Sequence, residues 1–331
     1  MLTKKENSLR CYRHEKPEYL PDFNDFNWMY VFSQDMERPA NDCAAGRGKD
    51  WFGVEWIFEE TGGAPLPDPT VEPILTDITK WREQVKFPDL DAFDWERAAR
   101  EDGIYEMDRE EKAFSLWVLN GVFERVQTLM GMEEALIAMM TETEDALDLM
   151  NAICDYKIKL YGKFIEYYKP DIIMQHDDYG SQANMLISPE LWRTLVKPQT
   201  KRLVEFCHEN GVIFEQHSCG FIEPIVPDLI EIGVDGWQGM HINDVPKLQK
   251  LADGKFNFFM ALNMQDFLAD DAAGLLTEDS LRARVHDTVM ECAPNGMYTP
   301  FVWVLGQDAD WWGVPIINDE IAKCREVITY K

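Results

Sequence analysis

The chain has 331 residues, of which 46% are hydrophobic, 12% aromatic and 28% charged, and its formal net charge is −28. This length and composition suit one large globular domain with a sizeable core. The negative charge argues against nucleic acid, which needs clustered Lys and Arg, and against an anionic membrane surface. We therefore expect no nucleic acid and no membrane among its partners.

The cysteines and the N-terminus bear on the compartment. Seven cysteines are scattered along the chain without a C-x-x-C pair, which is typical of a reduced protein rather than a disulfide framework. The first ten residues contain no apolar stretch, so we expect no secretory signal. These features predict a cytoplasmic protein, and both a monomer and a homodimer agree with them.

In chain order, residues 1–75 are rich in Pro, Gly, Asp and aromatic residues and show little helical period. They predict an irregular N-terminal extension with a short strand at 53–57, followed by a charged helix-and-turn region over 76–103. From residue 113 onward, apolar runs of strand length alternate with amphipathic segments. The expected strands are 114–119, 172–176, 212–219, 234–240, 256–262 and 297–304. The expected helices are 122–130, 133–140, 143–168, 189–210 (with a break at Pro198), 222–232, 245–252, 279–292 and 318–329.

This alternation is typical of parallel βαβ units. The number of units predicts an α/β fold of the (β/α)8 TIM barrel type rather than an open sheet. No linker or internal repeat divides the chain, so we treat 76–331 as the barrel and 1–75 as an extension of the same domain. Active sites of such barrels lie at the C-terminal ends of the strands.

The most informative strand end is Glu215-Gln-His-Ser-Cys219. Side chains alternate along a strand, so Glu215, His217 and Cys219 share one face. A carboxylate, an imidazole and a thiol are common zinc ligands. A lone Cys is more often a small buried hydrophobe, and a lone His is often a hydrogen-bonded core residue. Their occurrence together predicts a metal site whose further ligands come from another strand.

The candidates for those further ligands follow other strands. His176, Asp177 and Asp178 end the strand 172–176, and His241 follows 234–240. Adjacent carboxylates point to opposite faces, so at most one of Asp177 and Asp178 is expected at the site. That residue could be a ligand, a general base or an anchor for His217. The alternative is an aspartate in a turn or at a helix N-terminus.

Three segments resemble the uroporphyrinogen decarboxylase superfamily: 187–192 followed by Pro198, His217-Ser-Cys-Gly220, and 225–235. The resemblance spans roughly residues 110–330 and implies a (β/α)8 barrel. One branch of the superfamily decarboxylates porphyrinogens, and the other comprises zinc-dependent methyltransferases that exchange methyl groups with a corrinoid protein or a thiol. His217 and Cys219 are similar to the zinc motif of the methyltransferases.

Two departures refine what the resemblance implies. The arginine-rich arm of the decarboxylases has only Arg47 in the corresponding segment, 41–48. The third zinc ligand of the thiol methyltransferases, a Cys near the last strand, has no counterpart in 296–303. A zinc ion would then need an oxygen or nitrogen ligand, for which Glu215 or an aspartate of 177–178 is the expected source.

The remaining resemblance is to the ether-cleaving methyltransferases, which 50–56 and 85–89 also resemble. It implies a zinc-assisted methyltransferase that moves a methyl group from a methoxylated aromatic compound, or from another small methyl donor, to the cobalt of a corrinoid protein. The metal ligands would be His217, Cys219 and Glu215, and the catalytic groups Asp178, Asp177 and His241. Two alternatives are a porphyrinogen decarboxylase and a ligand-binding barrel that has lost catalysis.

Overall fold

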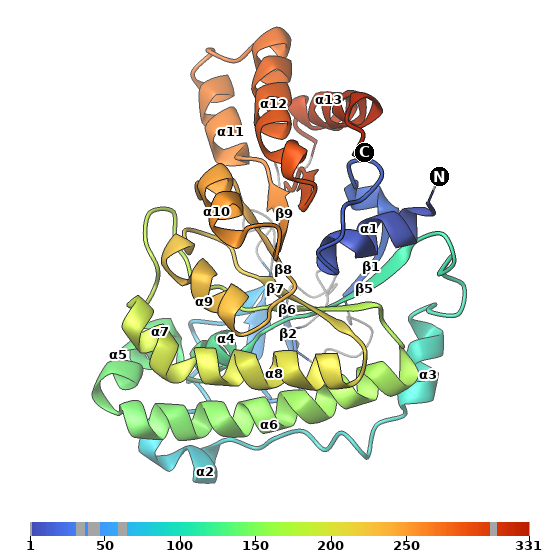
Figure 1. Cartoon of the computed structure of the whole chain (residues 1–331). Coiled ribbons are helices and arrows are strands. Elements are labelled where there is room, and N and C mark those ends of the chain that lie inside the picture. Colours follow the sequence, from blue (N-terminus) through green and yellow to red (C-terminus); the bar gives the residue numbers. More distant parts are fainter. Residues whose placement is uncertain (1, 31–36, 39–46, 59–64, 305–309, 331) are drawn as a thin grey trace.

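The computed structural model describes residues 2–30, 37–38, 47–58, 65–304 and 310–330 (Figure 1). Seven parallel strands form one sheet, in the order in which they occur along the chain. They are β1 (Phe26–Tyr30), β5 (Ala113–Val118), β6 (Ile172–His176), β7 (Ile213–His217), β8 (Gly236–Met240), β9 (Asn257–Ala261) and β10 (Tyr298–Phe301). The predicted alternation of strands and helices is confirmed from β5 onward.

The sheet is curled. Trp28 of β1 packs edge-on against Phe259 of β9, with ring centroids 5.2 Å apart, although four strands lie between β1 and β9 in the sheet. The predicted eightfold barrel is not confirmed, because the described residues supply seven parallel strands and no hydrogen-bonded pairing of β1 with β10. The observed fold is thus an α/β fold around a strongly curved, seven-stranded parallel sheet.

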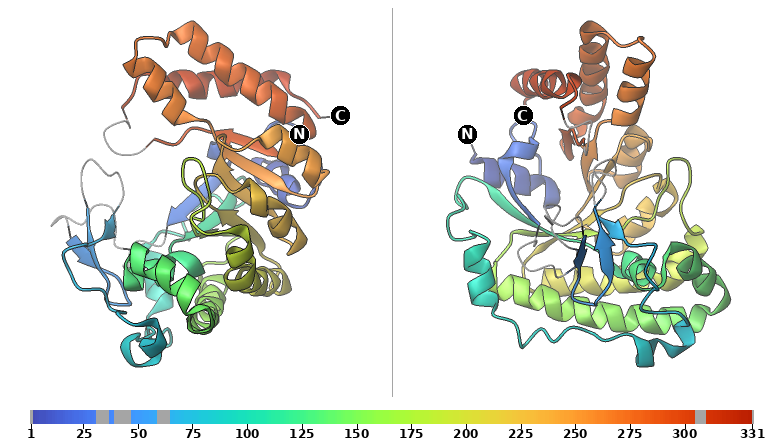
Figure 2. Two further views of the ribbon diagram at one scale, coloured as in Figure 1. Left: turned by 90° about the vertical axis from the view of Figure 1, so that its left-hand side faces the viewer. Right: turned by 180° about the vertical axis from the view of Figure 1, so that it is seen from behind.

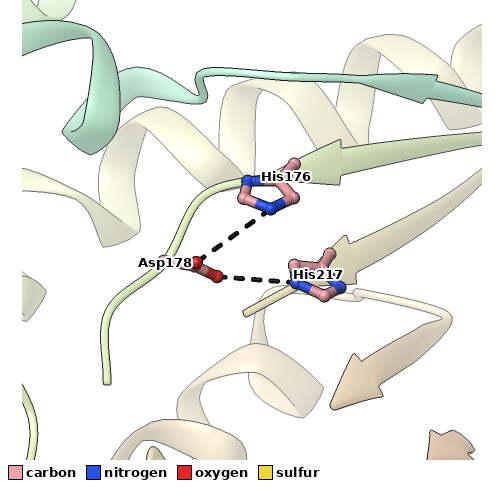
Figure 3. A group of neighbouring side chains, drawn as sticks. All are labelled: His176, Asp178 and His217. Atoms are coloured by element: carbon pink, nitrogen blue, oxygen red, sulfur yellow. Dashed lines mark ion pairs between the residues drawn. The ribbon is translucent and has the colours of Figure 1, made fainter. Parts of the chain in front are cut away.

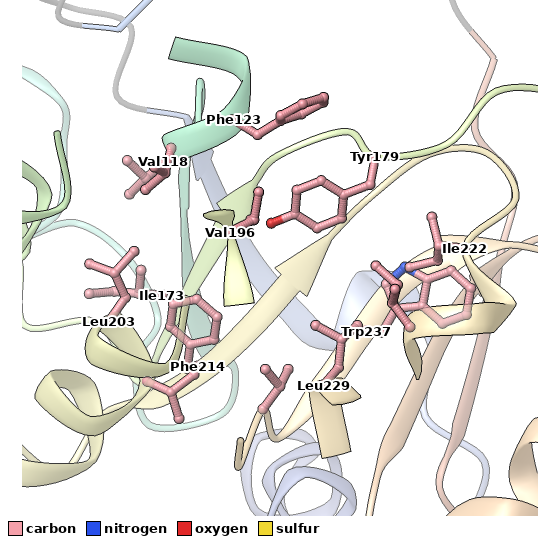
Figure 4. Packing of buried hydrophobic residues seen from close by; sticks show 14 of the residues in the cluster. Val118, Phe123, Ile173, Tyr179, Val196, Leu203, Phe214, Ile222, Leu229 and Trp237 are labelled. Atoms are coloured by element: carbon pink, nitrogen blue, oxygen red, sulfur yellow. The ribbon is translucent and has the colours of Figure 1, made fainter. Parts of the chain in front are cut away.

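Helices cover the convex face of the sheet (Figures 1 and 2). They are α4 (Val122–Met130), α5 (Met132–Thr141), α6 (Thr143–Tyr167), α7 (Pro189–Leu195), α8 (Lys197–Glu209), α9 (Val226–Glu231), α10 (Val245–Ala252), α11 (Met264–Ala272), α12 (Glu278–Cys292) and α13 (Gly313–Val327). Between helices and sheet lies the main core, where Ile173, Phe214 and Trp237 from successive strands meet Leu203 and Leu229 from α8 and α9 (Figure 4). Among the described residues, no helix is long and apolar enough to span a bilayer.

The predicted break in the helix over 189–210 is confirmed, since α7 ends at Leu195 and Pro198 lies in the first turn of α8. Proline is tolerated at that position because backbone N–H groups in the first turn of a helix have no partner within the helix. Helix α11 was not predicted. It follows β9 after two residues and is short and rich in Asp and Ala, so its apolar period is weak.

The prediction for the N-terminal segment requires correction. Residues 1–75 are not wholly irregular, because they contain helix α1 (Lys4–Tyr12) and the first strand of the main sheet, β1, which pairs in parallel with β5. Phe26-Asn-Trp-Met-Tyr30 lacks the aliphatic run by which the other strands were found. The predicted strand at 53–57 is confirmed as β3 (Glu55–Ile57), between β2 (Arg47–Lys49) and β4 (Leu66–Pro67) in a small antiparallel sheet. Two short helices, α2 (Trp81–Gln84) and α3 (Trp95–Glu101), follow.

The concave face of the main sheet holds a second, smaller hydrophobic cluster, made of Tyr12, Phe26, Ala113, Ile172, Phe259, Ala261 and Phe301. Ile172 lies on the same face of β6 as His176, four residues later. On β6, the cluster member Ile172 therefore lies at the beginning of the strand, and the polar side chain of His176 lies on the same face at its C-terminal end.

Candidate metal centre

The site begins with two histidines in register at the ends of neighbouring strands. His176 of β6 and His217 of β7 are paired residues in the parallel ladder, so both side chains leave the sheet at the same level. Their rings are stacked, with centroids 4.4 Å apart and planes inclined by 16°. This register brings two imidazoles together on the face that also carries Glu215.

Two further ligand types approach the Nε2 atoms of these rings. Asp178, in the loop after β6, lies between the rings, with Oδ1 3.5 Å from Nε2 of His217 and Oδ2 4.0 Å from Nε2 of His176 (Figure 3). The Sγ atom of Cys219 is 3.3 Å from the same Nε2 of His217. The backbone N–H of Cys219 donates to Asp178 Oδ1 at 2.6 Å, which fixes the two loops to each other. One ligand atom from each of His176, Asp178 and His217 fits within 4.8 Å of the others.

The opposite edges of both rings are held by acceptors. His176 Nδ1 lies 2.9 Å from Glu124 Oε2, and His217 Nδ1 lies 2.8 Å from Gln238 Oε1. An imidazole that donates its Nδ1–H to an acceptor presents an unprotonated Nε2, and metal-binding histidines are usually oriented in this way. The donor set of two imidazoles, a carboxylate and a thiol therefore fits zinc, which the sequence implies.

The charges of the site favour the unprotonated Nε2 for His217, whereas the Glu124 carboxylate favours the protonated form of His176. Burial opposes ionisation of Glu124, but the charge of His176 outweighs it and lowers the pKa of Glu124 to about 2. Burial likewise opposes protonation of His176, and the Glu124 carboxylate outweighs it, so that the pKa of His176 is raised. Burial and the neighbouring His176 lower the pKa of His217 to about 4. The imidazole of His217 is thus uncharged at neutral pH and can donate an electron pair to a metal. Glu124 is ionised and lies behind His176.

The two aspartates take opposite directions, as predicted. Asp178 reaches the ligand cluster, whereas Asp177 is buried and accepts hydrogen bonds from the backbone N–H groups of Phe123 (3.1 Å) and Glu124 (2.8 Å) in the first turn of α4. Gly121 permits this approach, since a Cβ there would lie 2.3 Å from Asp177 Cβ. Asp177 therefore caps the helix that carries Glu124, and its contacts in the structure are those of a positioning residue.

The other two predicted residues lie in different surroundings. Glu215 accepts a hydrogen bond from the Tyr12 hydroxyl, and burial raises its pKa to about 8. Nε2 of His241 lies 2.7 Å from the Tyr298 hydroxyl, and burial lowers the pKa of His241 to about 4. Among the described residues, the clusters of three or more potential ligands include neither of them, and they also leave out Cys219, whose Sγ contacts Nε2 of His217. Glu215 as a ligand and His241 as a catalytic group stay predictions.

A buried ion network fixes α4 in place. Arg125, fully buried, lies 2.6 Å from both Glu37 Oε2 and Asp50 Oδ2, and Lys157 of α6 lies 3.0 Å from Glu37 Oε1. The sequence pattern gave no sign of this network, because its members are separated by up to 120 residues. Arg125 is the neighbour of Glu124, so the network also positions the acceptor of His176.

A cavity of about 660 Å³ opens between the β2–β3–β4 sheet and helices α4 and α5. Glu124, Asn120, Arg38 and Trp56 are among the residues that line it. Asn120 has a left-handed backbone (φ 50°) and is buried, and its Oδ1 has no hydrogen-bond partner among the described residues. The cavity thus reaches the carboxylate that holds His176. The segment 41–46, most of the region compared with the decarboxylase arm, is outside the described residues.

The comparisons with known proteins agree with this architecture. Residues 119–258 match the family model described as Uroporphyrinogen decarboxylase (URO-D). No curated protein matches the chain. Among solved structures, a methyltransferase from Methanosarcina mazei is similar over 98% of this chain and 99% of that one, with 14% identity and a TM-score of 0.67. A 3-keto-D-glucoside 4-epimerase from E. coli covers 72% of this chain and 95% of its own, with 11% identity and a TM-score of only 0.35.

These findings define the chain as an α/β protein whose residues 119–258 are similar to the URO-D family model. The matched region includes the four residues of the cluster and their two acceptors. The resemblance to the uroporphyrinogen decarboxylase superfamily is thereby confirmed, and the similarity to the Methanosarcina mazei structure shows that the two folds are alike over 98% of this chain.

Proposed function

We propose that the chain is a zinc-dependent methyltransferase that transfers a methyl group from a methoxylated aromatic compound to a corrinoid protein. The observation that carries the proposal is the convergence of two side chains on Nε2 of His217. Cys219 Sγ lies 3.3 Å and Asp178 Oδ1 lies 3.5 Å from this atom, and His176 lies beside them. Ligand atoms bound to one tetrahedral zinc are separated by about 3.3–3.8 Å. The protein thus holds these groups at the spacing that a metal would require.

The reaction breaks the bond between the methyl carbon and the ether oxygen, and the electron pair of that bond stays on the oxygen. The methyl group passes to the reduced cobalt of the partner's corrinoid, which supplies the electron pair of the new bond. Zinc, when bound, would act as a Lewis acid for the leaving oxygen, which is a poor leaving group without it.

The residues around the cluster have separate tasks. His176 and His217 are held by Glu124 and Gln238, so their Nε2 atoms stay directed at one point. Asp178 faces both rings and accepts from the Cys219 backbone, which supports a ligand role. Its alternative role is to protonate the leaving oxygen, and a ligand role would prevent this.

The decarboxylase alternative is weaker on the described residues, and zinc content tests the alternative of a barrel without catalysis. Porphyrinogen decarboxylation needs several cations facing the substrate, whereas Arg38 is the one basic side chain among the described residues that line the cavity. The nearby Arg125 and Lys157 are already paired with Glu37 and Asp50. A barrel that has lost catalysis would hold less than stoichiometric zinc at the cluster.

The test combines elemental analysis with a methyl-transfer assay on a panel of methoxylated aromatics and a cobalt(I) corrinoid acceptor. His217→Ala and Cys219→Ser should each lose one equivalent of zinc and the methyl transfer. His208→Ala is the control, because His208 is a partly exposed histidine that contacts Asp235 away from the cluster. Full zinc content and full rate in the two site variants would refute the proposal.

A further inference from the structure

A second group of ligand-type side chains lies between the last two helices. Glu320 and Cys324 are four residues apart on α13, so they share the face that packs against α12. His286 of α12 lies opposite them, with Nδ1 3.4 Å from Glu320 Oε1 and 3.5 Å from Cys324 Sγ. One atom from each of the three residues lies within 4.8 Å of the others. Figure 1 shows the two helices, orange and red, in contact at one end of the molecule.

The two separations match those of a zinc tetrahedron. Zn–N, Zn–O and Zn–S bonds of about 2.0–2.3 Å at tetrahedral angles place a nitrogen about 3.4 Å from an oxygen ligand and about 3.6 Å from a sulfur ligand. Direct hydrogen bonds between an imidazole and a carboxylate are shorter, about 2.7–2.9 Å. The His286–Glu320 pair is therefore too wide for a good hydrogen bond and suitably spaced for a shared ion.

The second oxygen of Glu320 is held by cations. Glu320 Oε2 lies 3.3 Å from Arg282 Nη1 and 3.7 Å from Lys323 Nζ, whereas Oε1 faces His286. Groups that bind the outer oxygen of a ligating carboxylate fix its orientation. Asp319, 2.6 Å from Arg282, balances part of this positive charge.

Access to the group is open on one side. Cys324 is fully buried and Glu320 is 9% exposed, but the His286 side chain is 48% exposed. A metal ion can thus reach the three atoms from solvent, and water can supply the fourth ligand.

We propose that His286, Glu320 and Cys324 form a second zinc site, which clamps α13 to α12. Binding breaks the S–H bond of Cys324 and releases the proton to solvent, while the sulfur, the His286 nitrogen and a Glu320 oxygen each donate an electron pair to Zn²⁺. The charges of the thiolate and the carboxylate then balance the ion.

The clamp has a structural consequence. Arg325 of α13 lies 2.6 Å from Asp25, which immediately precedes β1, and Thr329 forms a β-bridge with Tyr19. Helix α13 thus braces the N-terminal segment beside the first strand, while α12 leads into the last strand, β10. A metal between α12 and α13 would stabilise the region where the two ends of the curved sheet approach each other.

The test separates this site from the first centre. In a His217→Ala/Cys219→Ser background, which lacks two ligands of the first centre, we expect one zinc per chain by elemental analysis. Adding His286→Ala should remove it, and His208→Ala, whose ring is 42% exposed, should not. Zinc should raise Tm by about 3 °C in the background protein and not after His286→Ala.

Cobalt(II) gives an independent readout, because a thiolate ligand produces a charge-transfer absorption that Cys324→Ser should abolish in the same background. Absence of zinc from the background protein, or its retention after His286→Ala or Cys324→Ser, would overturn the proposal. The contact would then be a thiol–imidazole hydrogen bond. None of these readouts depends on methyl transfer, so the result stands apart from the proposed activity.

Discussion

His176 and His217 lie one above the other at the ends of β6 and β7, with nearly parallel rings 4.4 Å apart, because the parallel register pairs these two residues directly. Neither ring points at the other's nitrogen, so the stack is not a hydrogen-bonded pair. Each ring instead uses Nδ1 for an acceptor outside the cluster and turns Nε2 toward Asp178. Register and outer hydrogen bonds together produce the convergence on which a metal site depends.

Glu124 accepts the outer hydrogen bond of His176, and its contribution to zinc binding can be tested by substitution. Glu124→Gln removes the anion that holds His176 Nδ1, so we expect zinc affinity to fall by about 10–100-fold with the fold retained. Competition with a chromophoric chelator measures the affinity. Glu133→Gln, in an exposed position in α5, is the matched control and should bind zinc as the unmodified protein does. Equal affinities for both variants would show that Glu124 does not support a metal ligand.

A substitution tests whether Glu215 is a ligand of the metal site. Its carboxyl group contacts Tyr12, and its pKa of about 8, raised by burial, means that it is largely protonated at neutral pH. Gln has the same shape and can still accept from the Tyr12 hydroxyl. We expect Glu215→Gln to retain stoichiometric zinc by elemental analysis, with Cys219→Ser as the depleted comparison. Loss of zinc in Glu215→Gln would instead establish Glu215 as a ligand, as the sequence alone suggested.

Two substitutions of Asp177 distinguish a helix-capping role from a catalytic role. Asp177→Ala removes the acceptor of two buried N–H groups of α4 and should lower the free energy of unfolding by about 2 kcal/mol. Asp177→Asn keeps one acceptor oxygen, so it should lose less stability and retain most of its methyl-transfer rate. Urea denaturation and kcat measure the two effects. A stable Asp177→Asn protein without activity would show that the carboxyl group takes part in the chemistry.

The sequence predicted well those elements whose apolar period is strong. Strand β6 and helices α4 and α10 have the expected bounds, because Ile, Val and Leu recur there at strand or helix spacing between clear Pro and Gly signals. Strand β1 was missed because its residues are aromatic and polar. Phe26 and Trp28 face the interior, where Trp28 contacts Phe259, and only the curvature of the sheet creates this contact.

The candidate site was predictable to the extent that its residues follow strands. His217, Cys219 and Asp178 were found from alternation and strand ends, and His176 was among the alternatives for a further ligand. Glu124 and Gln238 were not found, because an outer hydrogen bond leaves no local pattern. Gln238 gives one usable signal, as a polar side chain between Gly236 and Met240 on the interior face of β8.

The buried network around Arg125 should dominate the stability of this part of the fold. Arg125→Ala leaves Asp50 buried without its cationic partner and Glu37 with Lys157 alone, so we expect a loss of about 3–5 kcal/mol in the free energy of unfolding. Urea denaturation of the whole chain measures it. Arg100→Ala is the control, because its pair with Glu96 is exposed on α3 and should contribute less than about 1 kcal/mol. Similar small losses in both variants would contradict the assigned role of Arg125.

Asp228 carries the pH dependence that the structure predicts most directly. Burial opposes its ionisation, but hydrogen bonds from Arg193 and Lys197 outweigh it, so the pKa of Asp228 is lowered in the folded chain. A carboxyl group whose folded pKa lies below its unfolded value of about 3.9 stabilises the fold above that value. This contribution is lost as the pH falls through the folded pKa.

Asp228→Asn should therefore be less stable than the unmodified protein at pH 6, by about 1 kcal/mol, because the ion pairs are partly exposed. The difference should shrink as the pH falls from about 4 toward the folded pKa, since protonation then removes the same charge from the unmodified protein. Glu205→Gln, whose exposed contact with Lys201 is 3.7 Å long, serves as the control and should show no such pH-dependent difference. Urea denaturation at several pH values measures these differences, and a stability gap for Asp228→Asn that stays constant down to about pH 2 would contradict the assignment.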